Sequence, residues 1–360
     1  MQILLRYARY ALPVVFFGYA AVFNVEYARF PEPTEVPLDA SALKGALTAR
    51  LDNVYRQSLP HRDSAIGLIG ALRYLTVGEG RKGVVAGHDG WLFTAEEVRE
   101  APQDISRSLD RIARVRDRLE AVGAELVIVP VPGKLDVHVA ESNPETAAGI
   151  VRLYDGFLAG LKLRGVAVLD ARAVLRAEAR EGLAFFRTDT HWTPGGARAV
   201  ARGLATSGVI PLGTTTFAVT TVTVAQFTGD LVSFVTNENF ASLAGLRPEI
   251  AAPYTAAAEG PGSGNLDIFA ETAPGATLLI GTSYSANPAW SFAEALKLAL
   301  GRDVLNLAVE GEGPARPMLD YLASPYFRDA PPAVVIWEFP VRYLSDPTIW
   351  GDQGPVQSDA

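Results

Sequence analysis

The chain carries an acid, a base and a nucleophile of the types that serine acyl chemistry requires. Asp189 and His191 are separated by one residue, and Ser283 follows farther along the chain, in Gly281-Thr282-Ser283-Tyr284-Ser285. A serine hydroxyl becomes a strong nucleophile only when an imidazole takes its proton, and a carboxylate must hold that imidazole in the correct tautomer. Either segment alone is more often a turn or a surface hydrogen bond. Together they predict a triad of Ser283, His191 and Asp189.

The elements that must position these residues follow from the pattern of apolar segments. Strands are predicted at 126–129, 166–169, 277–280, 304–307 and 334–337, and helices at 105–122, 144–164, 171–181, 194–207 and 288–300. This alternation indicates a mostly parallel sheet covered by helices on both faces. Open sheets of this kind bind ligands at the carboxyl ends of their strands. Ser283 and the Asp189–His191 loop are both expected at that edge, with Ser285, farther from the strand end, as the rival nucleophile.

Two further groups are candidates for an oxyanion hole, which must donate hydrogen bonds to the charge that develops on the acyl oxygen. They are the backbone N–H of Ser283 and the side-chain amide of Asn306, at the end of the strand 304–307. The alternative for Asn306 is a simple strand-end hydrogen bond.

Substrate-binding candidates lie close to these positions. Trp192 and Tyr284 flank the catalytic residues, Arg187 precedes Asp189, and Lys134 follows a predicted strand at the same edge. Aromatic faces can stack on sugar rings and the cations can bind an acidic acceptor; Trp91 and Trp290 are further stacking candidates. Packing in the core is the alternative for the aromatic residues, and a solvated loop position is the alternative for Lys134.

The composition excludes several classes of protein. The formal net charge is −8, with 49% hydrophobic and 20% charged residues, so the chain is globular with an acidic surface that argues against nucleic-acid binding. The absence of cysteine excludes disulfides and a thiol nucleophile. The four histidines do not have metal-ligand spacing, and no nucleotide-binding glycine loop is present. We therefore expect no metal and no cofactor.

The N-terminus reads as an export signal. Arg6 and Arg9 precede an uncharged run from Tyr10 to Val25, and basic before apolar is typical of such signals. No clear Ala-x-Ala cleavage site follows, which favours an uncleaved anchor over a cleaved signal; a buried soluble helix is the remaining alternative.

The predicted organisation is a signal anchor at 1–28, a linker and lead-in helix at 29–50, a catalytic domain at 51–345 and a C-terminal tail at 346–360. Within the domain, 212–275 is predicted to be a β-containing insertion that either lines the active site or forms a structural flap.

Four segments of the chain resemble the alginate O-acetyltransferase family: Asp189–Pro194, Gly281–Ser285, Gly87–Phe93 and Pro130–Lys134. The similarity runs from about Leu51 to Tyr343. It implies a three-layer α/β domain like that of the SGNH hydrolases, with a permuted motif order. Ordinary SGNH esterases place the serine before the Asp and His and use Gly-Asp-Ser, whereas this chain has the serine last and Gly-Thr-Ser, as in the acetyltransferases.

The resemblance also implies a function. By position, Ser283 is the nucleophile, His191 the base and Asp189 its orienting partner. The family O-acetylates bacterial exopolysaccharides in the periplasm, so an acetyl-serine intermediate is expected. The implied partners are the exopolysaccharide acceptor, a membrane-bound O-acyltransferase that supplies acetyl groups, and other proteins of an export complex. Two alternatives remain: a polysaccharide acetyl esterase with the same triad, and a non-catalytic polymer-binding subunit.

Overall fold

The computed structural model describes residues 2–29, 62–259, 276–346 and 348–350. Contacts divide the chain into two units, Met1–Ile69 and Gly70–Ala360, which are described separately. Nearly all of the predicted linker and lead-in helix, and most of the predicted C-terminal tail, lie outside the described residues.

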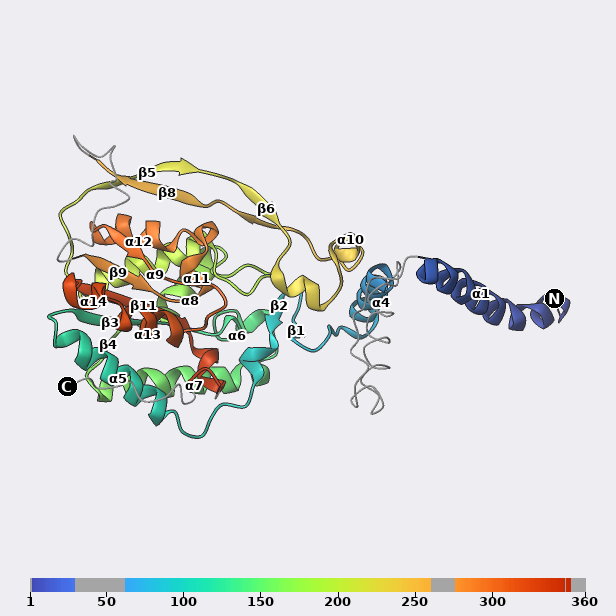
Figure 1. The fold of residues 1–360 in the computed structure, drawn as a ribbon, viewed down its shortest axis with the longest axis horizontal. Helices are drawn as coiled ribbons and strands as arrows, with labels where there is room; N and C mark the ends of the chain where they lie inside the picture. Colours follow the sequence, from blue (N-terminus) through green and yellow to red (C-terminus); the bar gives the residue numbers. More distant parts are fainter. Residues whose placement is uncertain (1, 30–61, 260–275, 347, 351–360) are drawn as a thin grey trace. The chain divides into compact units, whose positions relative to one another are not determined.

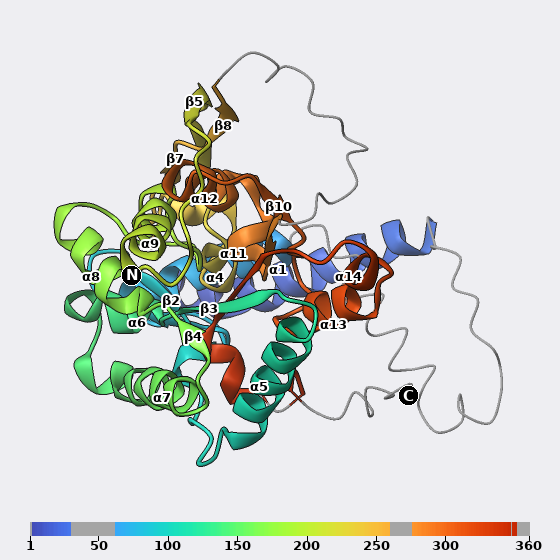
Figure 2. The same ribbon diagram turned by 90° about the vertical axis from the view of Figure 1, so that its left-hand side faces the viewer.

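The second unit is built around a five-stranded sheet in the order β10-β9-β11-β3-β4, in which every neighbouring pair is parallel. The strands are β3 (Glu125–Val131), β4 (Ala167–Val168), β9 (Thr277–Ile280), β10 (Val304–Asn306) and β11 (Val334–Pro340). The central pair, β11 and β3, is in register over seven residues of each strand. The predicted parallel sheet is therefore confirmed, and Figures 1 and 2 show it from two directions.

Helices cover both faces of the sheet, as the alternating sequence predicted. They are α5 (Ser106–Glu120), α7 (Pro144–Leu163), α8 (Ala171–Glu181), α9 (Pro194–Ser207), α12 (Phe292–Leu300) and α13 (Ala315–Ala323). Figure 1 shows α5 and α7 on one side of the sheet and α9 and α12 on the other.

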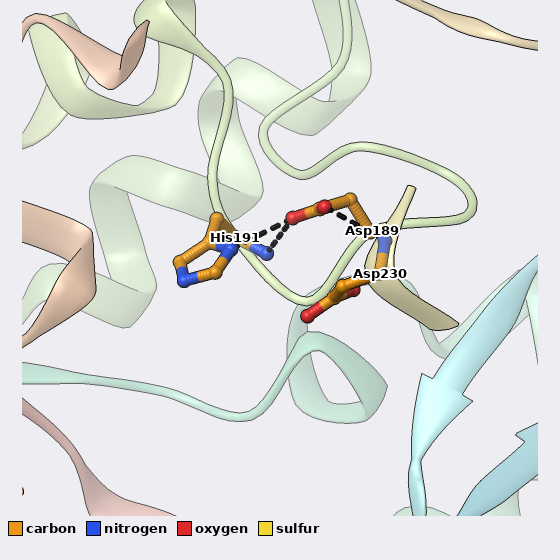
Figure 3. A group of neighbouring side chains, drawn as sticks. All are labelled: Asp189, His191 and Asp230. Atoms are coloured by element: carbon orange, nitrogen blue, oxygen red, sulfur yellow. Dashed lines mark hydrogen bonds and ion pairs between the residues drawn. The ribbon is translucent and has the colours of Figure 1, made fainter. Parts of the chain in front are cut away.

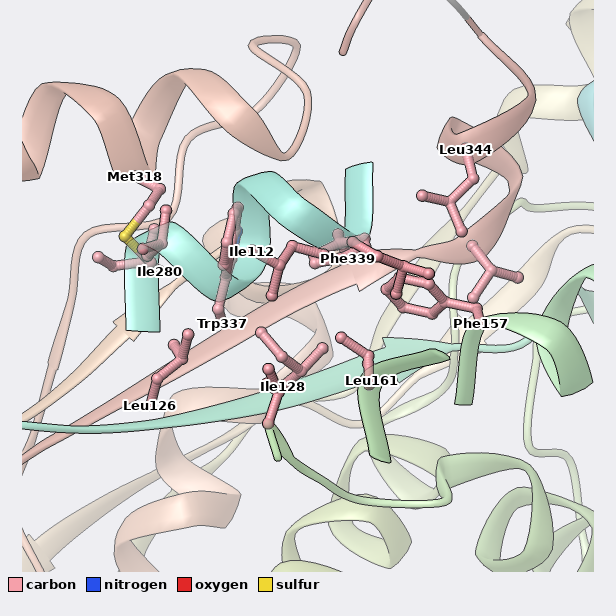
Figure 4. Packing of buried hydrophobic residues seen from close by; sticks show 14 of the residues in the cluster. Ile112, Leu126, Ile128, Phe157, Leu161, Ile280, Met318, Trp337, Phe339 and Leu344 are labelled. Atoms are coloured by element: carbon pink, nitrogen blue, oxygen red, sulfur yellow. The ribbon is translucent and has the colours of Figure 1, made fainter. Parts of the chain in front are cut away.

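The two faces of the sheet belong to separate hydrophobic clusters, because successive side chains of a strand point to opposite faces. Leu126 and Ile128 of β3 join one cluster, together with side chains of α5, α7 and α13, and Figure 4 shows this packing. Val127 and Val129 join the other cluster, with α8, α9 and α12. Fully burying one such side chain stabilises a fold by about 1.5–3 kcal/mol. Because the two clusters pack both faces of the sheet, they fix the strands whose ends carry the predicted catalytic residues.

Helix boundaries follow local signals. The helix α9 begins as predicted, with Pro194 in its first turn and the Thr193 hydroxyl accepting a hydrogen bond from the Gly196 N–H at 3.0 Å. The predicted helix 288–300 is in fact broken into a 3₁₀ turn, η4 (Pro288–Trp290), and α12. The break is at Ser291, whose φ of 54° cannot continue a helix.

Residues 212–259, which lie within the predicted insertion 212–275, contain four short strands. The antiparallel pairs are β5 (Phe217–Val222) with β8 (Tyr254–Ala258), and β6 (Ala225–Phe227) with β7 (Glu249–Ala251). Between β6 and β7 lie η3 (Asp230–Phe234) and α10 (Glu238–Ala241). Side chains of η3 pack with α4 and β2 in a third hydrophobic cluster.

The remaining elements connect this framework. They are the hairpin β1 (Val84–Ala86) and β2 (Leu92–Thr94), the short helices α6 (Lys134–Val137), α11 (Ser283–Ala286) and α14 (Tyr326–Asp329), and the 3₁₀ turns η1 (Ala95–Val98), η2 (Val139–Glu141) and η5 (Val341–Ser345). The hairpin turn has Asp89 at φ 52° and Gly90 at φ 79°. Positive φ at both central residues is the geometry that a tight hairpin requires, which explains the Asp-Gly pair.

Helix α1 (Gln2–Arg29) covers the predicted anchor segment, and α4 (Arg62–Val77) begins in the first unit and continues into the second. A membrane-crossing helix was expected over 1–28. None of the helices in the described ranges has the length and apolar character needed to cross a membrane.

Candidate active site

Ser283, His191 and Asp189 lie within hydrogen-bond distance of one another in a single chain of contacts. The His191 Nε2 atom is 2.8 Å from the Ser283 hydroxyl, and His191 Nδ1 is 2.7 Å from Asp189 Oδ1. Both distances are those expected between a nucleophile, its base and the group that orients the base. Asp189 is buried, while His191 and Ser283 are partly exposed. The arrangement keeps the acid away from water and leaves the nucleophile accessible.

The Asp189 carboxylate is held by two further contacts beyond the imidazole ring. Its Oδ1 atom accepts a hydrogen bond from the His191 backbone N–H at 2.9 Å, and Oδ2 accepts one from the Asp230 backbone N–H at 3.0 Å. Figure 3 shows Asp189, His191 and Asp230 together. Burial acts against the ionised form, but the hydrogen bonds and the nearby imidazole hold the pKa of Asp189 below its ordinary value. Asp189 is therefore an anion suited to stabilising a protonated His191.

The turn that presents Ser283 is fixed from below by Glu338 of β11. The fully buried Glu338 carboxylate accepts hydrogen bonds from the Thr282 N–H, the Thr282 hydroxyl and, at 2.7 Å, the Ser285 hydroxyl. A Cβ at Gly281 would lie 2.5 Å from Glu338 Oε2, so only glycine permits this approach. Burial raises the pKa of Glu338. Because Ser285 is buried and bound to Glu338, the geometry favours Ser283 over Ser285 as the nucleophile.

The two oxyanion candidates differ in their surroundings. Within the described residues, the Ser283 N–H has no hydrogen-bond partner, so it can donate to an acyl oxygen on Ser283. The Asn306 amide instead donates to the Ser285 carbonyl at 2.7 Å, and its oxygen accepts from the Ala308 N–H. This strand-end hydrogen bond uses one of the two N–H groups of the amide, so the role of Asn306 as an oxyanion donor stays a prediction.

Lys134 was expected to bind substrate, but the structure places it in the interior. Its side chain is 1% exposed, and its ammonium donates to three backbone carbonyls: Leu92 at 2.6 Å, Arg187 at 2.8 Å and Asp189 at 3.0 Å. It also lies 5.2 Å from the ring centres of Trp91 and Phe93. Burial lowers the pKa of Lys134 to about 8. Lys134 is therefore a structural support of the loop that carries Asp189.

Trp192 and Tyr284 are also buried, at 0% and 1% exposure, so neither offers a face to a sugar. The Trp192 indole donates to the Tyr284 carbonyl, and the Tyr284 hydroxyl donates to the Thr190 carbonyl at 2.7 Å. Burial raises the pKa of Tyr284, which keeps this donor protonated. The Arg342 guanidinium supports the same hydroxyl at 3.1 Å. Both aromatic residues connect the Asp189–His191 loop to the Ser283 turn, and their expected substrate contacts are corrected to structural ones.

The two other tryptophans named as stacking candidates are buried as well, each 4% exposed. Trp290 stacks on the His191 ring with 5.1 Å between ring centres and an interplanar angle of 21°. Trp91 packs on the His138 ring in the interior, with 4.3 Å between ring centres. Trp290 therefore limits rotation of the catalytic imidazole.

Arg187 is the substrate-binding candidate whose side chain remains exposed. In the described part of the chain its guanidinium makes no hydrogen bond or ion pair, while its backbone carbonyl accepts from Lys134 and from the Leu92 N–H at 2.9 Å. Its backbone is thus fixed two residues from Asp189, and its charge is available to a ligand.

Sequence reasoning missed several residues that hold this site, above all Asp230, Glu338 and Arg342. Glu338 had a signal, because it is the single charge within the apolar segment Val334–Pro340. Asp230 had none: it lies in the irregular part of the insertion, far from Asp189 in sequence.

Asp189, His191 and Asp230 each place one potential metal-ligating atom within 4.8 Å of the others. The Asp189 oxygens and His191 Nδ1 are already hydrogen-bonded in the acid–base pair. Asp189 and His191 therefore form the acid–base pair, while the Asp230 side chain accepts from the Thr190 N–H at 2.8 Å.

Comparisons with known proteins agree with this geometry. Residues 84–341 match the family model of the SGNH hydrolase-like domain of the acetyltransferase AlgX. A "probable alginate O-acetylase AlgJ" of Pseudomonas syringae pv. tomato is 36% identical over 341 residues, which cover 92% of this chain and 86% of that protein.

Two solved structures are also similar. The O-acetyltransferase domain of Pseudomonas putida AlgJ aligns with a TM-score of 0.64 and 36% identity, over 74% of this chain and 93% of that one. Pseudomonas aeruginosa AlgX aligns with a TM-score of 0.59 and 26% identity, over 74% of this chain and 65% of that one.

Proposed function

Because the chain belongs to the family of SGNH hydrolase-like acetyltransferases that includes AlgX and AlgJ, we propose that it O-acetylates alginate through an acetyl-Ser283 intermediate. The observation that supports this mechanism is the continuous pair of hydrogen bonds from Ser283 through His191 to Asp189, at 2.8 and 2.7 Å. The acceptor is taken from the relatives named as alginate O-acetylases.

The first half-reaction acetylates the enzyme. The Ser283 oxygen attacks the acetyl carbonyl while His191 Nε2 takes the hydroxyl proton, and Asp189 stabilises the imidazolium. The Ser283 N–H is positioned to donate to the oxyanion of the tetrahedral intermediate. Collapse of that intermediate breaks the bond to the donor, and His191 returns the proton to the leaving group.

The second half-reaction transfers the acetyl group. His191 takes the proton of a sugar hydroxyl, the sugar oxygen attacks acetyl-Ser283, and the serine leaves with the proton. Water can replace the sugar and would make the enzyme an esterase. A bound acceptor competes with bulk water because a positioned group can reach an effective molarity of about 10⁵ M or more.

Arg187 is the residue proposed to hold an acidic acceptor near His191. Alginate is a polyanion and the chain has a formal net charge of −8, so bulk electrostatics oppose binding and a local cation is needed. The exposed Arg187 guanidinium, two residues from Asp189, meets that requirement.

The proposal also covers where the protein works in the cell and which partner supplies the acetyl group. The segment with Arg6 and Arg9 before the uncharged run Tyr10–Val25 supports export to the periplasm, with the N-terminal helix as a tether to the inner membrane or as a cleaved signal. The periplasm lacks acetyl-CoA, so a membrane-bound O-acyltransferase is the expected donor partner, within a larger export complex. Cell fractionation with N-terminal sequencing tests this part; a chain found in the cytoplasm would contradict it.

The test of the activity is acetyl transfer from an activated ester to uronic-acid oligomers, followed by mass spectrometry. Ser283→Ala, His191→Ala and Asp189→Ala should each remove most turnover, by about a thousandfold or more for Ser283→Ala, and their effects should not add because the three act as one unit. Ser285→Ala is the matched control. If no uronic-acid or glucan oligomer gains an acetyl group and a pre-acetylated polymer is deacetylated instead, the enzyme is an esterase.

A further inference from the structure

The peptide group between Asp189 and Thr190 is bound at both ends by side chains of opposite charge. Its carbonyl accepts a hydrogen bond from the Lys134 ammonium at 3.0 Å, and its N–H donates to Asp230 Oδ1 at 2.8 Å. This peptide directly follows the catalytic acid and precedes His191 by one residue. The orientation of this peptide therefore fixes the backbone positions from which the Asp189 and His191 side chains extend.

Asp230 makes a second, reciprocal contact with the same loop. Its backbone N–H donates to Asp189 Oδ2 at 3.0 Å, while its side chain accepts from the Thr190 N–H. One residue of the insertion thus holds the catalytic carboxylate, as Figure 3 shows, and also the peptide next to it.

The backbone around Asp230 is fixed against the loop, which makes these contacts specific. A Cβ at Gly229 would lie 2.3 Å from the Thr188 carbonyl oxygen, so this position admits only glycine without a shift of the backbone. The Leu231 N–H donates to that same oxygen at 3.2 Å. Glu249 of β7 accepts from both the N–H and the hydroxyl of Thr188, at 2.6 and 2.7 Å.

Asp230 does not act as the acid partner of the imidazole itself. His191 Nδ1 is hydrogen-bonded to Asp189, and no hydrogen bond joins the Asp230 side chain to the His191 ring among the described residues. Asp230 is also an exposed residue, whereas Asp189 is buried. The contribution of the Asp230 side chain therefore passes through the Thr190 peptide.

Resting on the function proposed above, we propose that Asp230 is a positioning residue for acetyl transfer, which fixes the Asp189–Thr190 peptide opposite Lys134 and thereby aligns Asp189 with His191. The insertion that carries it is then a working part of the active site. Displacing the catalytic groups by about 1 Å can cost on the order of 10²-fold in rate, so losing one of the two holds on this peptide should be visible in kcat.

The test compares Asp230→Ala with Asp230→Asn in the full-length protein. Alanine removes the acceptor of the Thr190 N–H, whereas the asparagine side-chain oxygen can still accept that hydrogen bond. Glu238→Gln is the matched control, because Glu238 is an exposed acid on α10 of the same insertion. The readouts are kcat and KM on an activated acetyl ester, and the low-field proton NMR signal of the His191 Nδ1–H bound to Asp189.

Asp230→Ala should lower kcat by about tenfold or more, leave KM close to that of the wild type, and weaken or shift the low-field signal. Asp230→Asn and Glu238→Gln should retain both kcat and the signal. If Asp230→Ala does not fold, Asp230→Ser serves in its place. The serine hydroxyl ends one bond short of the position of Asp230 Oδ1, so this variant also lacks the acceptor of the Thr190 N–H.

Two results would overturn the inference. One is a kcat and a low-field signal in Asp230→Ala equal to those of Glu238→Gln. The other is an equal loss in Asp230→Ala and Asp230→Asn, which would assign the effect to charge and not to the hydrogen bond. Ser283→Ala in the same assay separates the two proposals: if it is inactive while Asp230→Ala is normal, only the positioning role fails, and if it remains active, both fail.

Discussion

Replacing Lys134 by methionine tests whether this buried ammonium supports the catalytic loop. Methionine fills a similar volume but leaves the carbonyls of Leu92, Arg187 and Asp189 without their shared donor. The Arg187 carbonyl keeps its hydrogen bond from the Leu92 N–H, so two carbonyls are left without a partner. An unsatisfied buried acceptor costs about 1–3 kcal/mol, so the two cost about 4 kcal/mol at the middle of that range.

An opposing effect reduces this loss. Burial lowers the pKa of Lys134 from 10.5 to about 8, and a shift of that size means that holding the charge inside the fold costs about 3 kcal/mol at neutral pH. Methionine removes that cost. The net expectation for Lys134→Met at pH 7 is therefore a loss of about 1 kcal/mol in the free energy of unfolding. Turnover should also fall, because the Asp189 carbonyl no longer has a hydrogen-bond donor.

The stability difference between the wild type and Lys134→Met should also depend on pH, in a direction set by the pKa of Lys134. The folded-state pKa of Lys134 lies below its unfolded value, so between about pH 8 and pH 10.5 the unfolded chain binds more protons. The stability of the wild type relative to Lys134→Met should therefore rise over this interval and be constant below it.

Urea denaturation followed by tryptophan fluorescence at pH 7 and pH 9.5 measures both quantities. Lys82→Met, at an exposed position, is the control and should change stability by less than about 0.5 kcal/mol. The reasoning is refuted if Lys134→Met is as stable and as active as the wild type, or if the stability difference shrinks as the pH rises.

Two further predictions concern residues near the nucleophile and the acceptor. Asn306→Ala should lower kcat on a small ester by less than about tenfold, because one N–H and the oxygen of its amide are bound to backbone groups; a loss of about 10²–10³-fold would identify it as an oxyanion donor. Arg187→Ala should raise KM for uronic-acid oligomers and leave turnover of an uncharged acetyl ester unchanged, measured by steady-state kinetics; an equal change with both substrates would remove Arg187 from acceptor binding.

Local patterns in the sequence were enough to predict the parallel sheet and the closeness of the three catalytic residues. Ser283 follows a buried strand, and Asp189 and His191 share one loop, so their meeting at one edge of the sheet depends only on strand order and the parallel arrangement. The start of α9 was equally local, since Thr193 and Pro194 form a cap on their own.

Contacts made across the fold could not be predicted in this way. A lysine that follows a strand is usually solvated, and Lys134 is buried only because three carbonyls from separate segments converge on it. Trp192 was a candidate for stacking on a sugar and Tyr284 for flanking the pocket, yet both fill the space between the two catalytic segments. Asp230 reaches Asp189 through an irregular insertion whose path has no periodic signal.

Trapping the acyl-enzyme tests the central claim most directly. The protein is mixed with an activated acetyl ester without an acceptor, quenched rapidly, and its peptides are sequenced by mass spectrometry. The account predicts a single acetyl group on Ser283 that disappears when a uronic-acid oligomer is added and reappears on the oligomer, with no acetyl group on Ser285. Turnover of the ester without any acetyl-Ser283, or an acetyl group on Ser285 in its place, would contradict the account.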